Sequence, residues 1–452
     1  MPPTNDPPIE PRLETYHFHE QDWNDYDELH DTFDHEIPTT FNTATYVCDR
    51  WATATPDRTA VTLVGANGTV TEYSFEDLHR SANRLAHFFD DRGVERGDRV
   101  AVSGVQSVEC LVTHLAAWKL GAISVPVSIL YGPDGLAYRL ADCGASVFVA
   151  DPSSLKHVRE RSDAIESLTT MISVGDRPAE EEISFDSAVK GRPIEFETMA
   201  VEADDDATIM YTSGTTGSPK GVVHGHRLLL GLLPGFLTGV CNMEIRADDT
   251  LHTPAEWSWL GSLYSGVLSS LYYGIPVVGD ANPRFDPAET LAILDAHDVS
   301  ILGGAATIYR MMMDVPDVVE RYDLTSLRVV VQGGEPFSQR IVDWLRETVG
   351  DVAIHEGYGQ TETGTIIRDC EALGVPHRTE YMGRPIPGAE LDVLELDEPK
   401  PLAAGQLGEI ALRYESLPSY FKTYWRRPDA VSSTQSADWH RMGDLGERSE
   451  DD

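Results

Sequence analysis

The chain has 452 residues, of which 74 are Asp or Glu and 35 are Lys or Arg, so its formal charge is −39 at pH 7. A field of this sign repels nucleic acid and anionic membrane surfaces, and neither is an expected partner. Hydrophobic residues make up 41% of the chain, which is enough for a large core, and the length fits about three domain-sized units.

The acidic residues are spread along the whole chain, in clusters such as Glu180-Glu181-Glu182 and Asp204-Asp205-Asp206. Disorder is one explanation for such charge, but dense apolar segments argue against it. We interpret the composition as that of a halophilic folded protein, because self-repulsion is tolerable where the Debye length is only about 3 Å, as at 1 M salt.

Cysteine usage and the absence of targeting segments predict a cytoplasmic protein. The five cysteines are dispersed without C-x-x-C spacing, which indicates reduced thiols rather than a disulfide framework or a zinc site. No secretory signal is visible at the N-terminus. The most apolar run, residues 228–240, contains Pro234 and falls short of the ~18 residues of a spanning helix. We expect a buried core helix there.

The first half of the chain alternates between strands and helices. Residues 1–40 form an acidic extension that wraps the surface or stays loosely ordered. Strands are expected at 60–64, 99–102, 125–127 and 146–150, with helices at 41–51, 74–91, from 107 onward and at 135–143. Ser74 with Asp77, and Ser107, are typical helix starts. This alternation predicts a parallel, doubly wound sheet.

A β-prone run at 207–210 leads into a loop rich in glycine and hydroxyl groups. The segment reads Tyr211-Thr212-Ser213-Gly214-Thr215-Thr216-Gly217-Ser218-Pro219-Lys220-Gly221. A strand that feeds such a loop turns backbone N–H groups outward into a concave anion site, and glycine lets a phosphate approach closely. Lys220, one of only six lysines in the chain, adds a positive charge. An ordinary flexible turn is the alternative.

This loop resembles, position by position, the signature [YF]-T-S-G-[ST]-T-G-x-P-K-G of the AMP-forming acyl-CoA synthetases, within the adenylate-forming superfamily. It is not a Walker-type P-loop, because Lys220 follows proline and precedes glycine. The resemblance implies catalytic roles for Thr212 and Lys220. It implies nucleotide binding by the residues between them, which are Ser213, Gly214, Thr215, Thr216 and Gly217.

After the loop, strands are expected at 275–278, 299–302 and 327–332, with a helix at about 287–297. Beyond Tyr381, glycine and proline punctuate short alternating runs, which predicts a small β-barrel-like subdomain. The predicted organisation is α/β: two doubly wound, Rossmann-like subdomains over residues 41–380 and the β-barrel-like subdomain over 381–452.

Three further segments resemble nucleotide-binding motifs of the same family. Gly333-Gly334-Glu335-Pro336 follows a buried strand, where ligands of α/β sheets bind, although a plain strand-to-helix turn would read the same. Gly357-Tyr358-Gly359-Gln360-Thr361-Glu362 resembles G-Y-G-x-T-E. It implies nucleotide contacts from Tyr358 and Gln360, and catalytic roles for Thr361 and Glu362, with Glu362 also the Mg²⁺ ligand. Asp444, in a W-x-x-[TS]-G-D-like segment where Met442 replaces the hydroxyl residue, is the expected acceptor for the ribose hydroxyls.

The acyl pocket is predicted from Trp257, Trp259 and Gly359. Both tryptophans lie in Ala255-Glu256-Trp257-Ser258-Trp259, which resembles the family's [AS]-D-x-[GA]-W, although they could equally be core residues. Acetate-specific members carry tryptophan at the position of Gly359, so glycine implies an acyl group longer than acetate and a short- or medium-chain synthetase. His224 and His226 follow the loop and are either structural or catalytic.

The resemblance covers the family's large domain from about Phe41 onward. The sequence stops eight residues after Asp444, whereas the family continues with a hinge and a small mobile C-terminal domain that carries a catalytic lysine. We therefore expect this chain alone to bind nucleotide, to adenylate weakly and to transfer to CoA hardly at all. A separately encoded C-terminal domain, acting in trans, would restore activity.

The implied reaction has two steps and uses ATP, Mg²⁺ and CoA with a small carboxylic acid. The carboxylate attacks the α-phosphate of ATP to give acyl-AMP and pyrophosphate, and the CoA thiol then displaces AMP. Two alternatives are a non-catalytic nucleotide- or acyl-binding protein and an enzyme that adenylates an amino or aryl acid.

Overall fold

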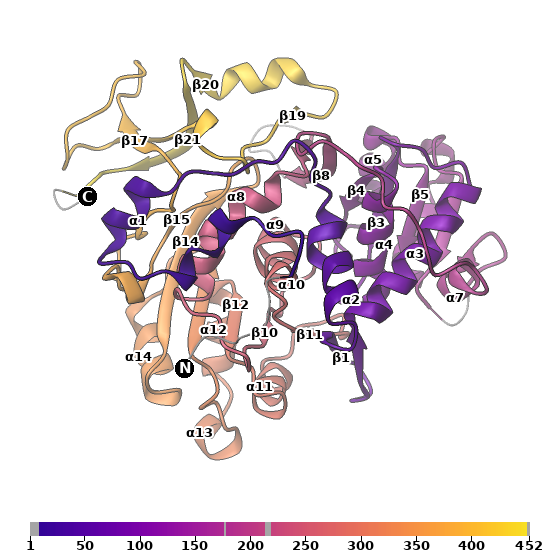
Figure 1. Cartoon of the computed structure of the whole chain (residues 1–452), viewed down its shortest axis with the longest axis horizontal. Coiled ribbons are helices and arrows are strands. Elements are labelled where there is room, and N and C mark those ends of the chain that lie inside the picture. The colour runs from indigo at the N-terminus through magenta and orange to yellow at the C-terminus, as the bar shows by residue number, and fades with distance from the viewer. Residues whose placement is uncertain (1–8, 176–177, 213–217, 450–452) are drawn as a thin grey trace.

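The computed structural model describes residues 9–175, 178–212 and 218–449, and this part of the chain is organised around three sheets (Figure 1). The first sheet has nine described strands in the order β16-β15-β14-β13-β12-β10-β11-β1-β2. The strands from β14 to β1 are parallel, and β15, β16 and β2 join antiparallel at the two edges. The bounds, in spatial order, are Arg384–Pro385, Gly364–Arg368, Ala353–Gln360, Val329–Gly333, Ile301–Gly304, Leu251–His252, Val277–Asp280, Thr59–Val64 and Val70–Ser74.

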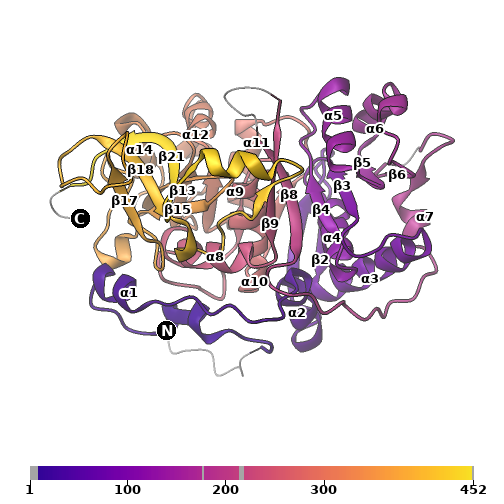
Figure 2. The same ribbon diagram turned by 90° about the horizontal axis from the view of Figure 1, so that it is seen from above.

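The second sheet, among the described residues, has eight strands in the order β19-β9-β8-β4-β3-β5-β6-β7. It is parallel from β8 to β7, whereas β9 and β19 add antiparallel at one edge. The bounds, in spatial order, are Thr423–Tyr424, Lys220–Gly225, Asp206–Thr212, Ile123–Pro126, Arg99–Ser103, Val147–Ala150, Thr170–Ser173 and Ile183–Ser184. Figure 2 shows this sheet beside the first, with β8 and β9 nearest to the boundary.

The third sheet is antiparallel, with the described order β17-β18-β21-β20. Its bounds are Leu391–Leu394, Gly408–Arg413, Trp439–Gly446 and Gln435–Ser436. Leu412 and Met442 of this sheet share a hydrophobic cluster with Ile366 of β15 and Val222 of β9. The small sheet therefore packs where the two large sheets meet. The architecture confirms the predicted fold class, two doubly wound α/β units with a small β subdomain.

Helices cover the faces of both large sheets, and several begin where polar side chains cap them. Ser74 and Asp77 form a reciprocal capping box at α3, and Ser107 accepts a hydrogen bond from the backbone N–H of Cys110 at α4, as residues of these types do at helix starts. The α-helix bounds, from α1 to α14, are Tyr26–Thr32, Arg50–Ala54, Phe75–Asp91, Val108–Lys119, Pro133–Cys143, Pro152–Arg159, Phe185–Val189, Leu228–Gly235, Leu260–Ser262, Ser269–Tyr272, Pro287–Ala296, Ala306–Met313, Val318–Arg321 and Gln339–Thr348.

The most apolar run of the sequence forms α8 and the helical turn η4 (Phe236–Val240), and every residue in them is buried. The core helix expected there is confirmed. Among the described residues, no helix is long and apolar enough to cross a bilayer.

The described part of the N-terminal extension packs on the body of the protein. It contains a 3₁₀ segment, η1 (Glu14–Glu20), and α1. The hydroxyl of Tyr26 donates to the carbonyl of Pro385 at 2.8 Å, and that of Tyr273 donates to the carbonyl of Tyr16 at 2.7 Å. Figure 2 shows this segment along one edge of the molecule, from α1 to α2.

Candidate active site

The two ends of the Gly-rich loop lie side by side. Thr212, the last residue of β8, pairs directly with Lys220, the first residue of β9. The predicted nucleotide-binding residues Ser213, Gly214, Thr215, Thr216 and Gly217 lie outside the described residues. This antiparallel pairing of β8 with β9 fixes the backbone of Lys220 beside that of Thr212.

Tyr424 connects Lys220 to Glu362. The Lys220 ammonium lies 4.7 Å from the centre of the Tyr424 ring, within the range of a cation–π contact. The Tyr424 hydroxyl donates to Glu362 Oε1 at 2.8 Å. Burial, with the Glu362 carboxylate, raises the pKa of Tyr424 well above its usual range, so the hydroxyl stays a donor. Tyr424 thus positions both predicted charged groups of the site.

Tyr358 and Gln360 of β14 converge on Asp444 of β21. The Tyr358 hydroxyl donates to Asp444 Oδ2 at 2.6 Å, and the Gln360 amide donates to the same oxygen at 3.2 Å. Gln360 also donates to the Met442 carbonyl at 2.5 Å. Asp444 is exposed, and burial with the Asp444 carboxylate raises the pKa of Tyr358. The structure therefore joins Asp444 to two predicted nucleotide contacts that precede it by 86 and 84 residues.

The segment Gly333-Gly334-Glu335-Pro336 lies at the end of β13, next to β14. Gly334 has φ +97°, a backbone conformation that favours glycine. Glu335 is exposed and its carboxylate pairs with Arg310 of α12 at 2.7 Å. An exposed pair of this kind is worth only about 0–1 kcal/mol, so the carboxylate remains available to a ligand.

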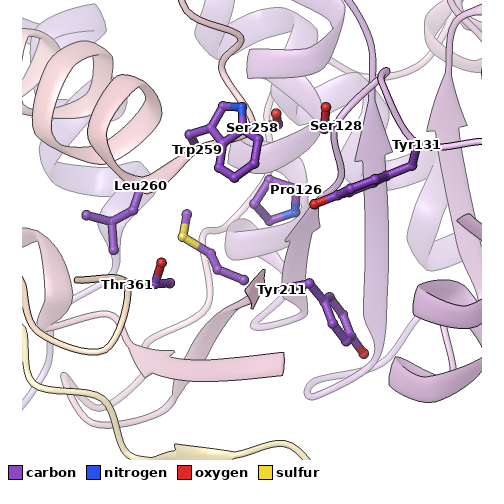
Figure 3. Close-up of a pocket in the computed structure, with 9 residues that line it drawn as sticks. Pro126, Ser128, Tyr131, Tyr211, Ser258, Trp259, Leu260 and Thr361 are labelled. Carbon is purple, nitrogen blue, oxygen red and sulfur yellow. The ribbon is translucent and has the colours of Figure 1, made fainter. Parts of the chain in front are cut away.

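A pocket opens between the two large sheets (Figure 3). Its lining consists of Pro126, Ser128, Tyr131, Met210, Tyr211, Ser258, Trp259, Leu260 and Thr361. Leu260 and Thr361 lie on one side and Tyr131 and Tyr211 on the other, with Trp259 between them (Figure 3). Thr361, a predicted catalytic residue, and Trp259, a predicted acyl-pocket residue, both line this pocket. The lining combines apolar side chains with the hydroxyl groups of serine, threonine and tyrosine residues.

Two residues predicted for the acyl pocket are placed elsewhere. Trp257 is 5% exposed, belongs to the main core cluster and packs on Gly279. It is therefore a core residue, which was the alternative to a role in the acyl pocket. Gly359 does not line the described pocket. A Cβ at Gly359 would lie 1.9 Å from the Gly364 carbonyl oxygen, so the tight β14–β15 hairpin is itself a reason for glycine there.

His224 and His226 are buried and hydrogen-bonded within the framework. His224 Nε2 donates to the Thr361 carbonyl at 2.8 Å. His226 Nδ1 accepts from the backbone N–H of Thr43 at 3.2 Å. Burial lowers the pKa of His224 to about 4 and that of His226 to about 3. Both are therefore neutral near pH 7 and act as structural groups, and His224 fixes the backbone at Thr361.

Glu362 fits the requirements of a magnesium ligand. It is half-buried, and the described contacts of its carboxylate engage Oε1 only. Mg²⁺ is usually bound by one or two carboxylates together with substrate phosphates, and Glu362 stands near Lys220 at the base of the phosphate loop. There it would hold an ion that neutralises charge on the phosphates.

The fold and this arrangement are those of an α/β enzyme, and comparisons with known proteins agree. A family model described as AMP-binding enzyme matches residues 48–425. The chain is 29% identical over 399 residues to "4-coumarate--CoA ligase 5" of Oryza sativa subsp. japonica, covering 87% of this chain and 71% of that protein. It is 27% identical over 440 residues to "Acyl-coenzyme A synthetase ACSM3, mitochondrial" of Mus musculus, covering 95% and 74%.

Among solved structures, the Brucella canis acyl-CoA synthetase superposes with a TM-score of 0.85 at 27% identity, covering 95% of this chain and 78% of that one. The chain belongs to the AMP-binding enzyme family. Its relatives are adenylate-forming acid–CoA ligases that use ATP and CoA.

Sequence reasoning missed Tyr424 and most of the pocket wall. Tyr424 sits in Thr423-Tyr424-Trp425, a run with no signature of its own, and it reaches the site only because β19 pairs with β9. Ser128 and Tyr131 follow β4, whose end faces the same boundary. The only feature of the sequence that indicated these two residues is their position just after a predicted parallel strand, where ligands bind in such sheets.

Proposed function

We propose that this protein activates a short- or medium-chain carboxylic acid with ATP, forming acyl-AMP and then acyl-CoA. The observation that carries the proposal is the grouping of Lys220, Tyr424 and Glu362 at the base of the phosphate loop, beside a pocket that contains Thr361. Lys220 and a Mg²⁺ ion on Glu362 would offset charge on the phosphates. Tyr358, Gln360 and Asp444 would hold the nucleoside.

Electrostatic stabilisation of this kind usually supplies the largest share of catalysis. The acid would lie in the pocket with its carboxylate toward Thr361 and its apolar part toward Trp259 and Leu260. A bound acid between Trp259 and Leu260 would leave less room for water to hydrolyse the mixed anhydride of acyl-AMP.

Pyrophosphate release by the purified chain tests the proposal, with ATP, Mg²⁺ and straight-chain acids from C2 to C10 in multimolar KCl. We expect acid-dependent release that peaks beyond acetate. Glu362→Gln should lower it by about 100-fold or more, whereas Glu395→Gln, an exposed carboxylate paired with Lys400, should leave it unchanged. ATP binding without any acid-dependent release would refute adenylation by this chain and favour a nucleotide-binding protein. Release that appears only with an added C-terminal domain would assign the activity to the assembled pair.

An aryl acid is the second candidate substrate, because three of the pocket residues are aromatic: Tyr131, Tyr211 and Trp259. Aromatic side chains pack well against planar rings, and the rice relative is named for a coumarate substrate. Adding benzoate and 4-coumarate to the same assay decides between the two. A kcat/KM for either that exceeds those of all straight-chain acids would replace the aliphatic proposal.

A further inference from the structure

Arg368, the last residue of β15, is a buried arginine without an acidic partner. Its residue is 6% exposed, and neither Nε nor Nη1 has a hydrogen-bond partner in the described structure. Nη2 makes one long contact, at 3.5 Å, to Thr365 Oγ1. Burying an ionised group costs several kcal/mol unless it is paired, so this guanidinium has an unmet requirement for an acceptor.

Two other arginines with little exposed surface, Arg328 and Arg50, have short hydrogen bonds to acceptors that Arg368 lacks. Arg328 forms a two-pronged pair with the Asp249 carboxylate, at 2.7 and 2.6 Å. Arg50 donates to the carbonyls of Pro11 and Tyr272. Arg368 has neither arrangement, although the chain carries 74 carboxylates. The neighbouring carboxylate, Asp369, is engaged by the backbone N–H of Glu356 at 2.8 Å and by His377 at 3.2 Å.

Glycines from two elements make the room that the Arg368 side chain occupies. A Cβ at Gly239 of η4 would lie 2.6 Å from Arg368 Cδ, and a Cβ at Gly357 of β14 would lie 2.7 Å from its Cζ and Nη1. Gly357 is also the register partner of Arg368 in the sheet. Any side chain at either position would displace the guanidinium, so the backbone around it is shaped to keep an arginine there.

The position of Arg368 relates it to the substrate pocket. Thr361, which lines the pocket, follows Gly357 by four residues, or roughly 13 Å along an extended strand at about 3.3 Å per residue. Leu260, also in the pocket wall, belongs to α9, which packs against β15. A substrate that enters beside Thr361 and runs along β15 would therefore reach the Arg368 guanidinium with its far end.

We propose that Arg368 binds the second carboxylate of a dicarboxylic acid whose first carboxylate is activated near Thr361. A guanidinium binds a carboxylate in a planar, two-pronged geometry, which would satisfy the free Nε and Nη1 donors. Although burial lowers the pKa of Arg368 to about 10, the group stays cationic at pH 7. The inference rests on the proposed function for its substrate class, but binding can be measured without turnover.

Calorimetry on the purified chain without ATP tests the inference, using α,ω-dicarboxylates from C4 to C10 and monocarboxylates of equal length. One diacid should bind at least about 30-fold tighter than its matched monoacid, because truncating one partner of a buried charge pair costs 2 kcal/mol or more. Arg368→Met should abolish this preference. Arg50→Met, another buried arginine, should lower stability and leave the ratio unchanged.

Gly239→Ala is a second variant, which keeps the charge of Arg368 and displaces its side chain. It too should reduce the ratio of diacid affinity to monoacid affinity. A wild-type protein that binds monoacids as tightly as diacids at every length would overturn the inference, with no variant required. Tight diacid binding without pyrophosphate release would support the Arg368 site and refute adenylation by this chain instead. Diacid preference retained in both variants would place the second carboxylate elsewhere.

Discussion

Acidification should unfold this protein well above the pH at which its carboxylates titrate, because many of its histidines are buried in the neutral form. Burial lowers the pKa of nine histidines, in each case to about 4 or below: His17, His19, His35, His114, His224, His226, His252, His355 and His440. In the unfolded chain each would titrate near the ordinary histidine pKa of about 6.5.

The unfolded state therefore binds protons first as the pH falls, and stability is full above about pH 6.5 and declines from there toward pH 4. For His224, a shift from 6.5 to about 4 corresponds to about 3 kcal/mol at 1.36 kcal/mol per pKa unit. Total stabilities are typically about 5–15 kcal/mol. Protonation of a few such histidines is enough to unfold the protein, so the midpoint of acid unfolding should lie between pH 6.5 and pH 4.

Urea unfolding followed by circular dichroism, at constant multimolar KCl and a series of pH values, measures this loss. His224→Gln keeps a donor for the Thr361 carbonyl and removes the titration. Between pH 7 and pH 4, the free energy of unfolding of this variant should decrease by about 3 kcal/mol less than that of the wild type. His87→Gln, a half-buried position on α3, is the matched control and should follow the wild-type curve. A free energy of unfolding that stays flat over this interval would refute the reasoning.

Three further predictions concern the site and the charge. Tyr424→Phe keeps the ring beside Lys220 and removes the hydrogen bond to Glu362. Because a hydrogen bond to a charged group is worth about 1.5–3 kcal/mol, pyrophosphate release should fall about 10- to 160-fold, and an unchanged rate would show that Tyr424 does not position Glu362. Gly359→Ala should cost about 1–3 kcal/mol of stability in urea, since its Cβ meets the Gly364 backbone, and a neutral result would show that the hairpin can relax. The free energy of unfolding should rise from dilute buffer to multimolar KCl because the chain carries a charge of −39 that salt screens, and greater stability in dilute buffer would contradict a halophilic protein.

Hydrophobic patterns and helix-capping residues were enough to predict many of the helices and strands. The Ser74–Asp77 start predicted a helix to about residue 91, and α3 spans Phe75–Asp91. The valine run in 327–332 was expected to be a buried strand, and β13 lies in the middle of the nine-stranded sheet. Sheet membership was not predictable in this way. The strand at 60–64 precedes β3 to β9 in sequence, yet it pairs with β11 in the other sheet, a long-range choice that local patterns do not encode.

The structure brings predicted nucleotide-binding residues together and separates predicted acyl-pocket residues. Tyr358, Gln360 and Asp444 form one hydrogen-bonded group. Trp257 and Trp259 are two residues apart and of one type, but Trp257 is in the core and Trp259 is 47% exposed at the pocket. Which of them faces the pocket depends on the start of α9 at Leu260, and composition carries no information on that point.

β19, two residues long, closes one edge of the eight-stranded sheet, although the rest of its chain segment belongs to the small antiparallel sheet. It pairs with β9 through Thr423 and Tyr424, and without it the outer side of β9 would present unpaired backbone N–H and carbonyl groups. Unprotected edges of this kind template aggregation between chains. Residues 381–452 therefore cover a sheet edge as well as supplying Tyr424 and Asp444, and a fragment that ends at residue 380 would expose that edge and lack both side chains.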